Sequence, residues 1–286
     1  MKLDNQINNI SPKKSLGQNF LIDLNIAQKT VHLLEVVPDD IILEIGPGKG
    51  VLTHYLSELT NDLYAVEIDR RLSDILNMQY PKKYYPNLNI LNQDFLELDF
   101  SHITNSQNLA IIGNIPYYLT SSILFKLFEN SRYVRTAVIM VQKEVANRLL
   151  SSAGTRTYGI LPIALSFYGK ISFSFNVPAY CFFPQPKVNS KVIAINFYKQ
   201  SDTINNSQEI LNMVKLTFQQ RRKKVSNALE TYLHSCGIDP KYFYDYLLTN
   251  SNYQVLDYLD KRPENLSRDD YIILFNSIQS IALNSK

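Results

Sequence analysis

The sequence is poor in the residues that build metal centres and disulfide frameworks. It contains only two cysteines, Cys181 and Cys236, with no neighbouring thiol, and four histidines spread over 286 residues. No spacing among these side chains matches a metal-ligand pattern. We therefore expect no metal cofactor and two free thiols in a reducing compartment.

Long apolar runs are also missing. No stretch of eighteen apolar residues occurs, and the polar segment 1–9 lacks the apolar core of a signal peptide. These absences predict a cytoplasmic protein without a membrane partner. We expect it to be a monomer.

A marked excess of one charge is lacking as well. Lys and Arg number 29 against 26 Asp and Glu, a net charge of +3. Such a balance does not indicate a nucleic-acid partner, so an argument for RNA must come from local clusters. The hydrophobic fraction of 45% is ordinary for a globular chain of this length.

Five short apolar segments alternate with helical patterns, which predicts a buried parallel sheet of the α/β class. Two further segments, 171–177 and 191–198, have no helical pattern between them and predict an antiparallel hairpin at the sheet edge. The five parallel strands are expected at 41–45, 63–66, 88–91, 109–112 and 137–141.

The character of the chain changes near Lys199. Residues 200–207 (QSDTINNS) are polar and patternless, as in a linker, and every segment beyond them has a helical pattern. The sequence predicts an α/β domain at 1–199 and a small C-terminal all-helical domain at 200–286.

A glycine-rich loop follows the first predicted strand. Residues 44–50 (EIGPGKG) read ExGxGxG and precede a helix expected from Val51. Glycines let the backbone turn sharply and approach a ligand. A dinucleotide fingerprint would read GxGxxG. The observed pattern instead resembles the first motif of Rossmann-like methyltransferases, where Gly46 and Gly48 would surround the methionine part of S-adenosylmethionine.

Acidic residues end the next two strands. Glu67 lies about twenty residues beyond the glycines, where a carboxylate accepts hydrogen bonds from ribose hydroxyls, a geometry that also suits NAD. Asp94 follows the third strand and could accept a hydrogen bond from an adenine amino group. Because open α/β sheets bind ligands at the carboxyl ends of their strands, the three features together predict a site for S-adenosylmethionine.

The fourth strand runs into Asn114-Ile115-Pro116-Tyr117. This pattern resembles the [DNS]-P-P-[YFW] motif of methyltransferases that act on planar amino nitrogens. The Asn114 side-chain oxygen and the Ile115 carbonyl could hold the two N–H groups of adenine N6, whose lone pair is otherwise delocalised into the ring. Pro116 stiffens the turn. Tyr117 offers a stacking surface for the extruded base, a contact worth about 1–3 kcal/mol.

Four motifs in order make the chain similar, nearly end to end, to the small-subunit ribosomal RNA adenine dimethyltransferase family. Residues 13–21 (KKSLGQNFL) resemble K-x-x-G-Q-N-F-L, in which Asn19 and Leu21 would contact the cofactor together with Asn114. Residues 182–190 (FFPQPKVNS) resemble F-x-P-x-P-K-V-D-S, in which Phe182 would be a second stacking face.

The other two motifs lie in the predicted helical domain. Residues 218–229 (FQQRRKKVSNAL) resemble F-x-Q-R-R-K-x-x-x-N-x-L, and residues 262–267 (RPENLS) resemble R-x-E-x-L-S. The resemblance implies dimethylation of the 6-amino groups of two adjacent adenines in the 3′-terminal hairpin loop of small-subunit (16S) rRNA, coupled to ribosome biogenesis. The implied partners are small-subunit rRNA and its assembly intermediates.

Three alternatives stay open. Asn189 stands where the family usually has Asp, and the Asn form also occurs in related macrolide-resistance enzymes that modify large-subunit RNA. The chain could also be an RNA-binding assembly factor without catalysis. Methylation of glutamine or DNA adenine is disfavoured by Ile115, because those families usually carry Pro there, and by the helical tail.

Basic residues predict where RNA phosphates bind. Arg221, Arg222, Lys223 and Lys224 put four positive charges on about one expected helical turn, which marks either a phosphate contact or a solvated helix face. Lys187 lies beside the proposed base pocket, and Lys13 and Lys14 precede the residues of segment 13–21 that would contact the cofactor. We expect the helical domain to recognise folded RNA by shape.

Overall fold

The computed structural model describes residues 10–59, 62–199, 201 and 205–284. The predicted polar segment 1–9 lies outside them, as does part of the predicted linker. The chain divides into two compact units, one made of 1–146 and 168–202 and the other of 147–167 and 203–286. The sequence placed a single boundary at 199, whereas the structure also groups 147–167 with the C-terminal helices.

Hydrogen bonds explain this grouping. The Gly154 N–H donates to the Glu264 carbonyl at 2.8 Å, and the Arg268 guanidinium donates to the Ser166 carbonyl at 3.1 Å. Both bonds join the segment to residues about one hundred positions later, a pairing that no local sequence pattern indicates.

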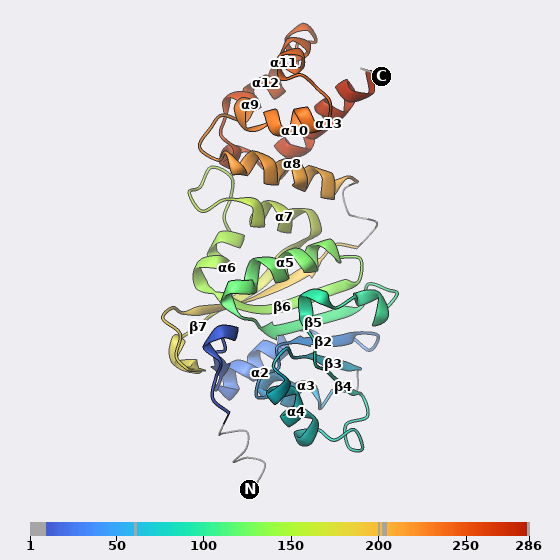
Figure 1. Ribbon diagram of the computed structural model, residues 1–286, viewed down its shortest axis with the longest axis vertical. Helices are drawn as coiled ribbons and strands as arrows, with labels where there is room; N and C mark the ends of the chain where they lie inside the picture. The colour runs from blue at the N-terminus through green and yellow to red at the C-terminus, as the bar shows by residue number, and fades with distance from the viewer. Residues whose placement is uncertain (1–9, 60–61, 200, 202–204, 285–286) are drawn as a thin grey trace. The chain divides into compact units, whose positions relative to one another are not determined.

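The first unit is built on a seven-stranded sheet, ordered β4-β3-β2-β5-β6-β9-β7 (Figure 1). The first five strands in this order are parallel, and β9 runs antiparallel to both of its neighbours, β6 and β7. The five predicted strands and the edge hairpin are confirmed, and so is the Rossmann-like α/β class. The strands are β2 (Ile41–Ile45), β3 (Leu63–Val66), β4 (Leu88–Leu91), β5 (Leu109–Asn114), β6 (Val134–Gln142), β7 (Gly169–Val177) and β9 (Ser190–Phe197).

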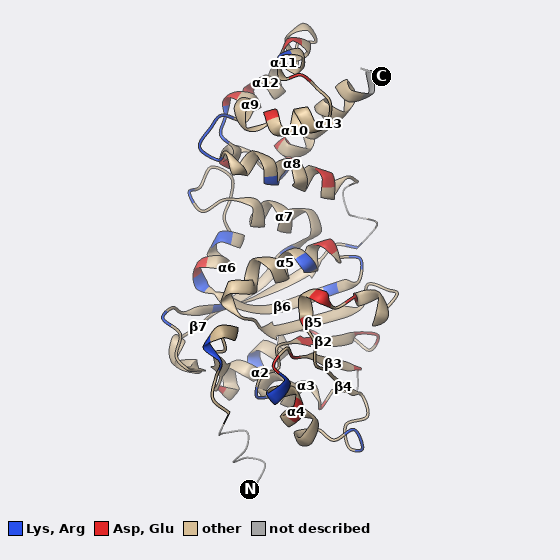
Figure 2. Cartoon of the chain, viewed as in Figure 1, with Lys and Arg blue, Asp and Glu red and all other residues tan. Residues whose placement is uncertain are grey.

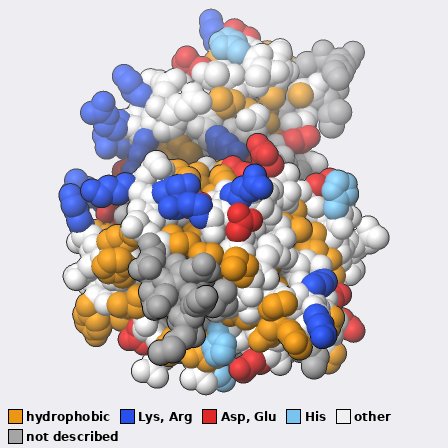
Figure 3. All heavy atoms as spheres, turned by 60° about the horizontal axis from the view of Figure 1, so that its bottom comes forward, with side chains coloured by type: hydrophobic (Ala, Val, Ile, Leu, Met, Phe, Trp, Pro, Cys, Tyr) orange, Lys and Arg blue, Asp and Glu red, His pale blue; other side chains and the backbone are white. Residues whose placement is uncertain are grey.

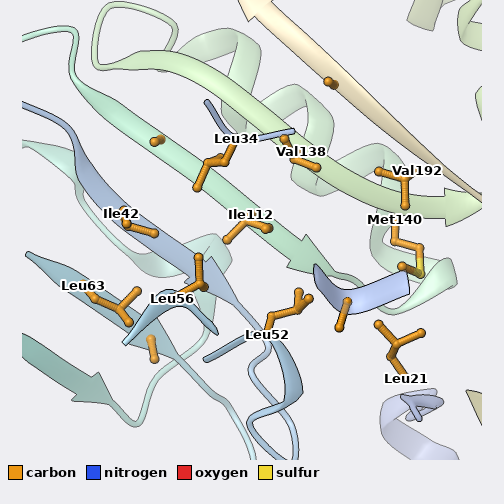
Figure 4. Packing of buried hydrophobic residues seen from close by; sticks show 14 of the residues in the cluster. Leu21, Leu34, Ile42, Leu52, Leu56, Leu63, Ile112, Val138, Met140 and Val192 are labelled. Atoms are coloured by element: carbon orange, nitrogen blue, oxygen red, sulfur yellow. The ribbon is translucent and has the colours of Figure 1, made fainter. Parts of the chain in front are cut away.

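Helices cover both faces of this sheet (Figure 1). They are α2 (Leu24–His32), α3 (Val51–Leu56), α4 (Arg70–Gln79), α5 (Thr120–Glu129) and α6 (Lys143–Leu149). Leu52 and Leu56 of α3 pack against Ile42 and Ile112 of the sheet, at the centre of the apolar cluster in Figure 4. Burying these side chains stabilises the sheet and holds the start of α3 beneath the glycine-rich loop.

A second, two-stranded sheet was not foreseen from the sequence. β1 (Phe20–Leu21) pairs antiparallel with β8 (Phe182–Phe183), so that Phe20 faces Phe183 and Leu21 faces Phe182. This pairing joins the first two family motifs, 13–21 and 182–190, which are separated by about 160 residues in the chain.

The second unit is all-helical, as predicted. Its helices are α7 (Ile160–Tyr168), α8 (Ser207–Gln219), α9 (Val225–Ala228), α10 (Glu230–Ser235), α11 (Pro240–Thr249), α12 (Tyr253–Asp260) and α13 (Arg268–Asn284). The Tyr271 hydroxyl is buried and donates to the Pro263 carbonyl at 3.0 Å. Within the described residues, no helix has the length and apolarity needed to cross a bilayer.

Candidate active site

A pocket of about 1060 Å³, part of it open to solvent, lies at the carboxyl ends of the parallel strands. Ten of the residues singled out from the sequence line it together. They are Asn19, Leu21, Gly46, Gly48, Glu67, Asp94, Asn114, Ile115, Pro116 and Tyr117.

The glycine-rich loop leaves room for a ligand. Gly46 has φ +62°, and a Cβ built there would meet no atom within 4 Å. Gly48 has φ +59°, and its Cβ would lie 3.1 Å from the Phe20 ring. Both positions favour glycine because L side chains rarely adopt positive φ. The backbone at Gly46 therefore borders open space that a side chain would fill, as a cradle for S-adenosylmethionine requires.

Glu67 joins this loop to the end of β3. Its carboxylate accepts the Gly48 N–H at 3.1 Å and the Asp69 N–H at 2.9 Å. The side chain is buried yet lines the pocket, and burial raises the pKa of its carboxyl. Each carboxylate oxygen has a second lone pair, so the group can also accept ribose hydroxyls.

Glu44 is a pocket residue that the sequence analysis did not single out. It is 1% exposed and accepts a hydrogen bond of 2.7 Å from the Thr53 hydroxyl. Burial, with a smaller effect from the charge of Glu67, raises the pKa of the Glu44 carboxyl to about 8. Its signal was the first letter of the ExGxGxG motif.

Asp94 caps a short 3-10 helix (Phe95–Glu97) at the end of the pocket that is predicted to hold adenine. Its carboxylate accepts the Leu96 N–H at 2.8 Å. Phe95 follows it and is buried, forming an apolar part of the lining. A carboxylate beside an apolar wall suits a flat purine with an amino group at its edge.

Asn114 ends β5 at the inner side of the pocket. Its side-chain nitrogen donates to the Asn19 carbonyl at 2.9 Å, so its side-chain oxygen is left as an acceptor. Gly113 before it is tightly packed, since a Cβ there would lie 2.7 Å from the Ile45 carbonyl oxygen. Pro116, with φ −58°, continues the loop. The hydrogen bond to Asn19 therefore fixes the orientation of the amide.

Tyr117 follows with its ring half-buried at the pocket. Its hydroxyl lies 2.6 Å from the Ser190 hydroxyl. Burial raises the pKa of the Tyr117 phenol, so it is neutral at physiological pH. The next residue, Tyr118, is 61% exposed and also lines the pocket, which the sequence analysis did not foresee.

The structure corrects the expectation for Phe182. Its side chain is 2% exposed, belongs to the apolar cluster and does not line the pocket. Phe183 is 57% exposed. Successive side chains of a strand point to opposite faces, so the β1–β8 pairing turns Phe182 inward and Phe183 outward. Phe182 therefore offers no open stacking face in this structure.

The basic run does not lie on a helical turn, which corrects a second expectation. Residues 221–224 connect α8 and α9 (Figure 2). Arg221 pairs with Glu264 and donates to the Arg156 carbonyl at 2.6 Å, and Lys224 pairs with Asp260 at 2.8 Å. Arg222 and Lys223 are exposed.

Basic and apolar side chains lie side by side on the surface of the first unit (Figure 3). Lys187 is exposed. The large apolar side chains exposed on this unit include Tyr118, Tyr180, Phe183 and Val188. Among the described residues, no group of three or more His, Cys, Asp or Glu could hold a metal ion.

Comparison with known proteins identifies relatives that match most of the chain. The model of the family described as "Ribosomal RNA adenine dimethylase" matches residues 9–255. "Ribosomal RNA small subunit methyltransferase A" of Francisella tularensis subsp. novicida is 38% identical over 92% of this chain and 96% of its own length. The protein of that name from Mycoplasma mobile is 39% identical with the same coverage.

Solved structures share the fold. A dimethyladenosine transferase from Plasmodium falciparum superposes with a TM-score of 0.74 and 26% identity, covering 91% of this chain and 98% of its own. The 23S rRNA methyltransferase ErmE superposes with a TM-score of 0.61 and 24% identity, covering 91% of this chain and 100% of its own. The second likeness concerns the fold alone.

Proposed function

Because the chain belongs to the ribosomal RNA adenine dimethylase family, we propose that it modifies small-subunit (16S) rRNA during ribosome biogenesis. The chain is an S-adenosylmethionine-dependent rRNA adenine dimethyltransferase. Its proposed targets are the 6-amino groups of two adjacent adenines in the 3′-terminal hairpin loop. Support for the small subunit comes from the relatives named "Ribosomal RNA small subunit methyltransferase A", which match 92% of the chain.

The placement of Asn114 carries this proposal. It lies at the carboxyl end of β5, in the same pocket as the glycine-rich loop, with its side-chain oxygen available as an acceptor. The oxygen and the neighbouring Ile115 carbonyl accept the two N–H groups of the adenine amine. This holds the nitrogen lone pair out of conjugation with the ring and directs it along one line.

S-adenosylmethionine, when bound, supplies a methyl group on a positively charged sulfur. Gly46, Gly48 and Glu67 would hold its methionine and ribose parts, Asp94 its adenine, and Asn19 and Leu21 the opposite wall. The amine becomes acidic only as the new N–C bond forms, so its proton can leave to water without a strong base. Alignment of the reacting atoms is then the main catalytic device, which can contribute about 7–11 kcal/mol.

Tyr117 would bind the extruded adenine by stacking. Its ring lines the pocket and its hydroxyl is hydrogen-bonded to that of Ser190, so the position of the ring is restricted before the base arrives. Preorganisation of this kind lowers the entropy that binding must overcome. Phe182 is not part of this surface, because it is buried.

Exposed cations would contact the rRNA backbone. We assign phosphate binding to Lys187, Arg222 and Lys223, which are exposed, and to Lys224 when its exposed pair with Asp260 opens. An exposed ion pair is worth about 0–1 kcal/mol, so a phosphate can compete for the lysine. We further propose that the protein acts as a monomer in the cytoplasm, on assembly intermediates of the small subunit.

A large-subunit target is the nearest rival. The Asn189 side-chain oxygen accepts the Ala179 N–H at 3.0 Å, a bond that the more usual Asp would also make. The residue type at 189 therefore does not favour the large subunit.

Transfer of labelled methyl groups to unmodified ribosomal subunits tests the proposal. We expect about four methyl groups per small subunit, two on each of two adenines, and none on large subunits. The variant Asn114→Ala should bind small subunits as the wild type does and transfer no methyl groups. Methylation of large subunits alone would refute the small-subunit assignment, and normal turnover by the variant would refute the role of Asn114.

A further inference from the structure

Asp69 gathers hydrogen bonds that the proposed function leaves unexplained. It begins α4, does not line the pocket, and its side chain is fully buried. The carboxylate accepts from the Arg71 guanidinium at 2.7 and 3.1 Å, the Arg71 N–H at 3.2 Å, the Lys13 ammonium at 3.2 Å and the Gln18 amide at 3.1 Å. Capping a helix needs only one of these bonds.

Two of these donors come from residues 13–19, which we call the strap. Gln18 is held at both ends of its amide, because its oxygen accepts the Lys13 N–H at 2.7 Å while its nitrogen donates to Asp69. Lys13 is held likewise through its N–H and its ammonium. Asp69 therefore fixes the strap at two points about 50 residues away in the chain.

The far end of the strap contacts the catalytic loop. The Asn19 carbonyl accepts the Asn114 side-chain N–H at 2.9 Å. A Cβ built at Gly17 would lie 3.2 Å from the Tyr118 ring and 3.7 Å from the Pro116 side chain, so the backbone there lies against the loop. A continuous series of contacts runs from Asp69 through Gln18 and Asn19 to Asn114.

We propose that Asp69 is a positioning residue for methyl transfer. By gripping Gln18, it fixes the Asn19 carbonyl, which in turn holds the Asn114 amide with its nitrogen away from the base and its oxygen toward it. This inference rests on the proposed function, since it assigns the orientation of the group that binds the adenine amine.

The physical reason lies in the symmetry of an amide. Rotation by 180° exchanges the donor and the acceptor of Asn114, and a donor facing the adenine amine would repel it. The neighbouring carbonyl of Asn19 decides between the two orientations. If the strap shifts, the Asn19 carbonyl no longer fixes the orientation of the Asn114 amide. A misplacement of a catalytic group by about 1 Å can lower the rate about 100-fold.

Two variants test the proposal from different ends of the network. Asp69→Asn keeps a side chain that caps helices well. It removes the negative charge that binds the Lys13 ammonium, and it removes one acceptor oxygen. Gln18→Ala removes the link itself. The control Arg71→Ala removes a partner of Asp69 that does not belong to the strap. Thermal melting of each variant checks that the fold persists.

The first readout is kcat for methyl transfer, measured with small subunits in excess over the enzyme. We expect kcat to fall at least about tenfold in Asp69→Asn and Gln18→Ala, with small-subunit affinity unchanged, and to stay within about threefold in Arg71→Ala. The fold-loss of rate in the double variant should be smaller than the product of the two single fold-losses, because both changes cut the Gln18 link, although Asp69→Asn also weakens the contact with Lys13. A kcat near wild type in both single variants overturns the proposal.

The second readout does not depend on the substrate. The side-chain amide signal of Asn114 in a proton–nitrogen NMR spectrum, assigned by its loss in Asn114→Ala, reports the hydrogen bond to Asn19. We expect it to move toward the frequencies of solvated amides in Asp69→Asn and Gln18→Ala, and to stay in place in Arg71→Ala. An unmoved signal in both variants refutes the positioning role of Asp69. Inactivity of the wild type on both subunits refutes only the proposed function, and the NMR test of Asp69 still applies.

Discussion

The Tyr117 hydroxyl lies 2.6 Å from the hydroxyl of Ser190, the first residue of β9. Ser190 is fully buried and ends the segment 182–190, whereas Tyr117 belongs to the catalytic loop. The contact therefore joins two motifs that the sequence analysis treated separately. It gives the last residue of the F-x-P-x-P-K-V-N-S segment a physical role.

Ser190→Ala tests this contact. The variant leaves the half-buried phenol without its partner, so we expect the free energy of unfolding to fall by about 1 kcal/mol. A looser Tyr117 ring should also lower the affinity for adenine. Denaturant unfolding and steady-state kinetics measure the two effects. Tyr117→Phe combined with Ser190→Ala should cost less than the sum of the single changes; additivity would show that the hydroxyls do not interact.

Glu44→Gln predicts a pH-dependent gain in stability. The pKa of the Glu44 carboxyl is about 8 in the folded chain, against 4.5 for an unperturbed Glu. Between these pH values the unfolded chain loses this proton and the folded chain keeps it, so the wild type loses stability as pH rises. The slope for one such group is up to about 1.4 kcal/mol per pH unit.

Glutamine is uncharged and can still accept the Thr53 hydroxyl. We therefore expect Glu44→Gln and the wild type to be similar near pH 5, and the variant to be the more stable at pH 8. Denaturant unfolding at both pH values measures the difference. A difference that does not change with pH would contradict a buried, protonated Glu44.

Phe182→Ala should destabilise the fold much more than Phe183→Ala. The Phe182 side chain is 2% exposed within the apolar cluster, so its removal leaves a cavity that costs about 3–5 kcal/mol. Phe183 is 57% exposed, and we expect its truncation to cost less than about 1 kcal/mol. Thermal and denaturant unfolding of the two variants give the comparison. Equal stabilities would contradict the side-chain alternation of β8.

Arg222→Ala with Lys223→Ala should weaken binding to small subunits. Loss of two phosphate contacts reduces the slope of log affinity against log salt by about 1 to 2. Arg221→Ala is the matched control, because Arg221 pairs with Glu264 and the Arg156 carbonyl. It should lower the melting temperature of the second unit. An unchanged salt slope in the double variant would remove these residues from the RNA surface.

The sequence alone determined the class of the fold and the order of the pocket residues. The ends of consecutive parallel strands meet at one edge of a sheet, so Gly46, Gly48, Glu67, Asp94 and Asn114 could be placed together without coordinates. The short apolar strands before Lys199 and the helical patterns beyond residue 207 are local properties, and a local pattern is enough to recognise them.

Only the tertiary structure decided which side chains face the pocket and which are used for packing. Phe182 is buried because β8 pairs with β1, and Arg221 is engaged because Glu264 lies against it, 43 positions along the chain. The grip of Asp69 on Gln18 spans 51 positions. Such pairings depend on how distant segments pack, and the same residue types would suit an exposed site equally well. The burial of a side chain is set by its neighbours in space, which the order of residues along the chain does not specify.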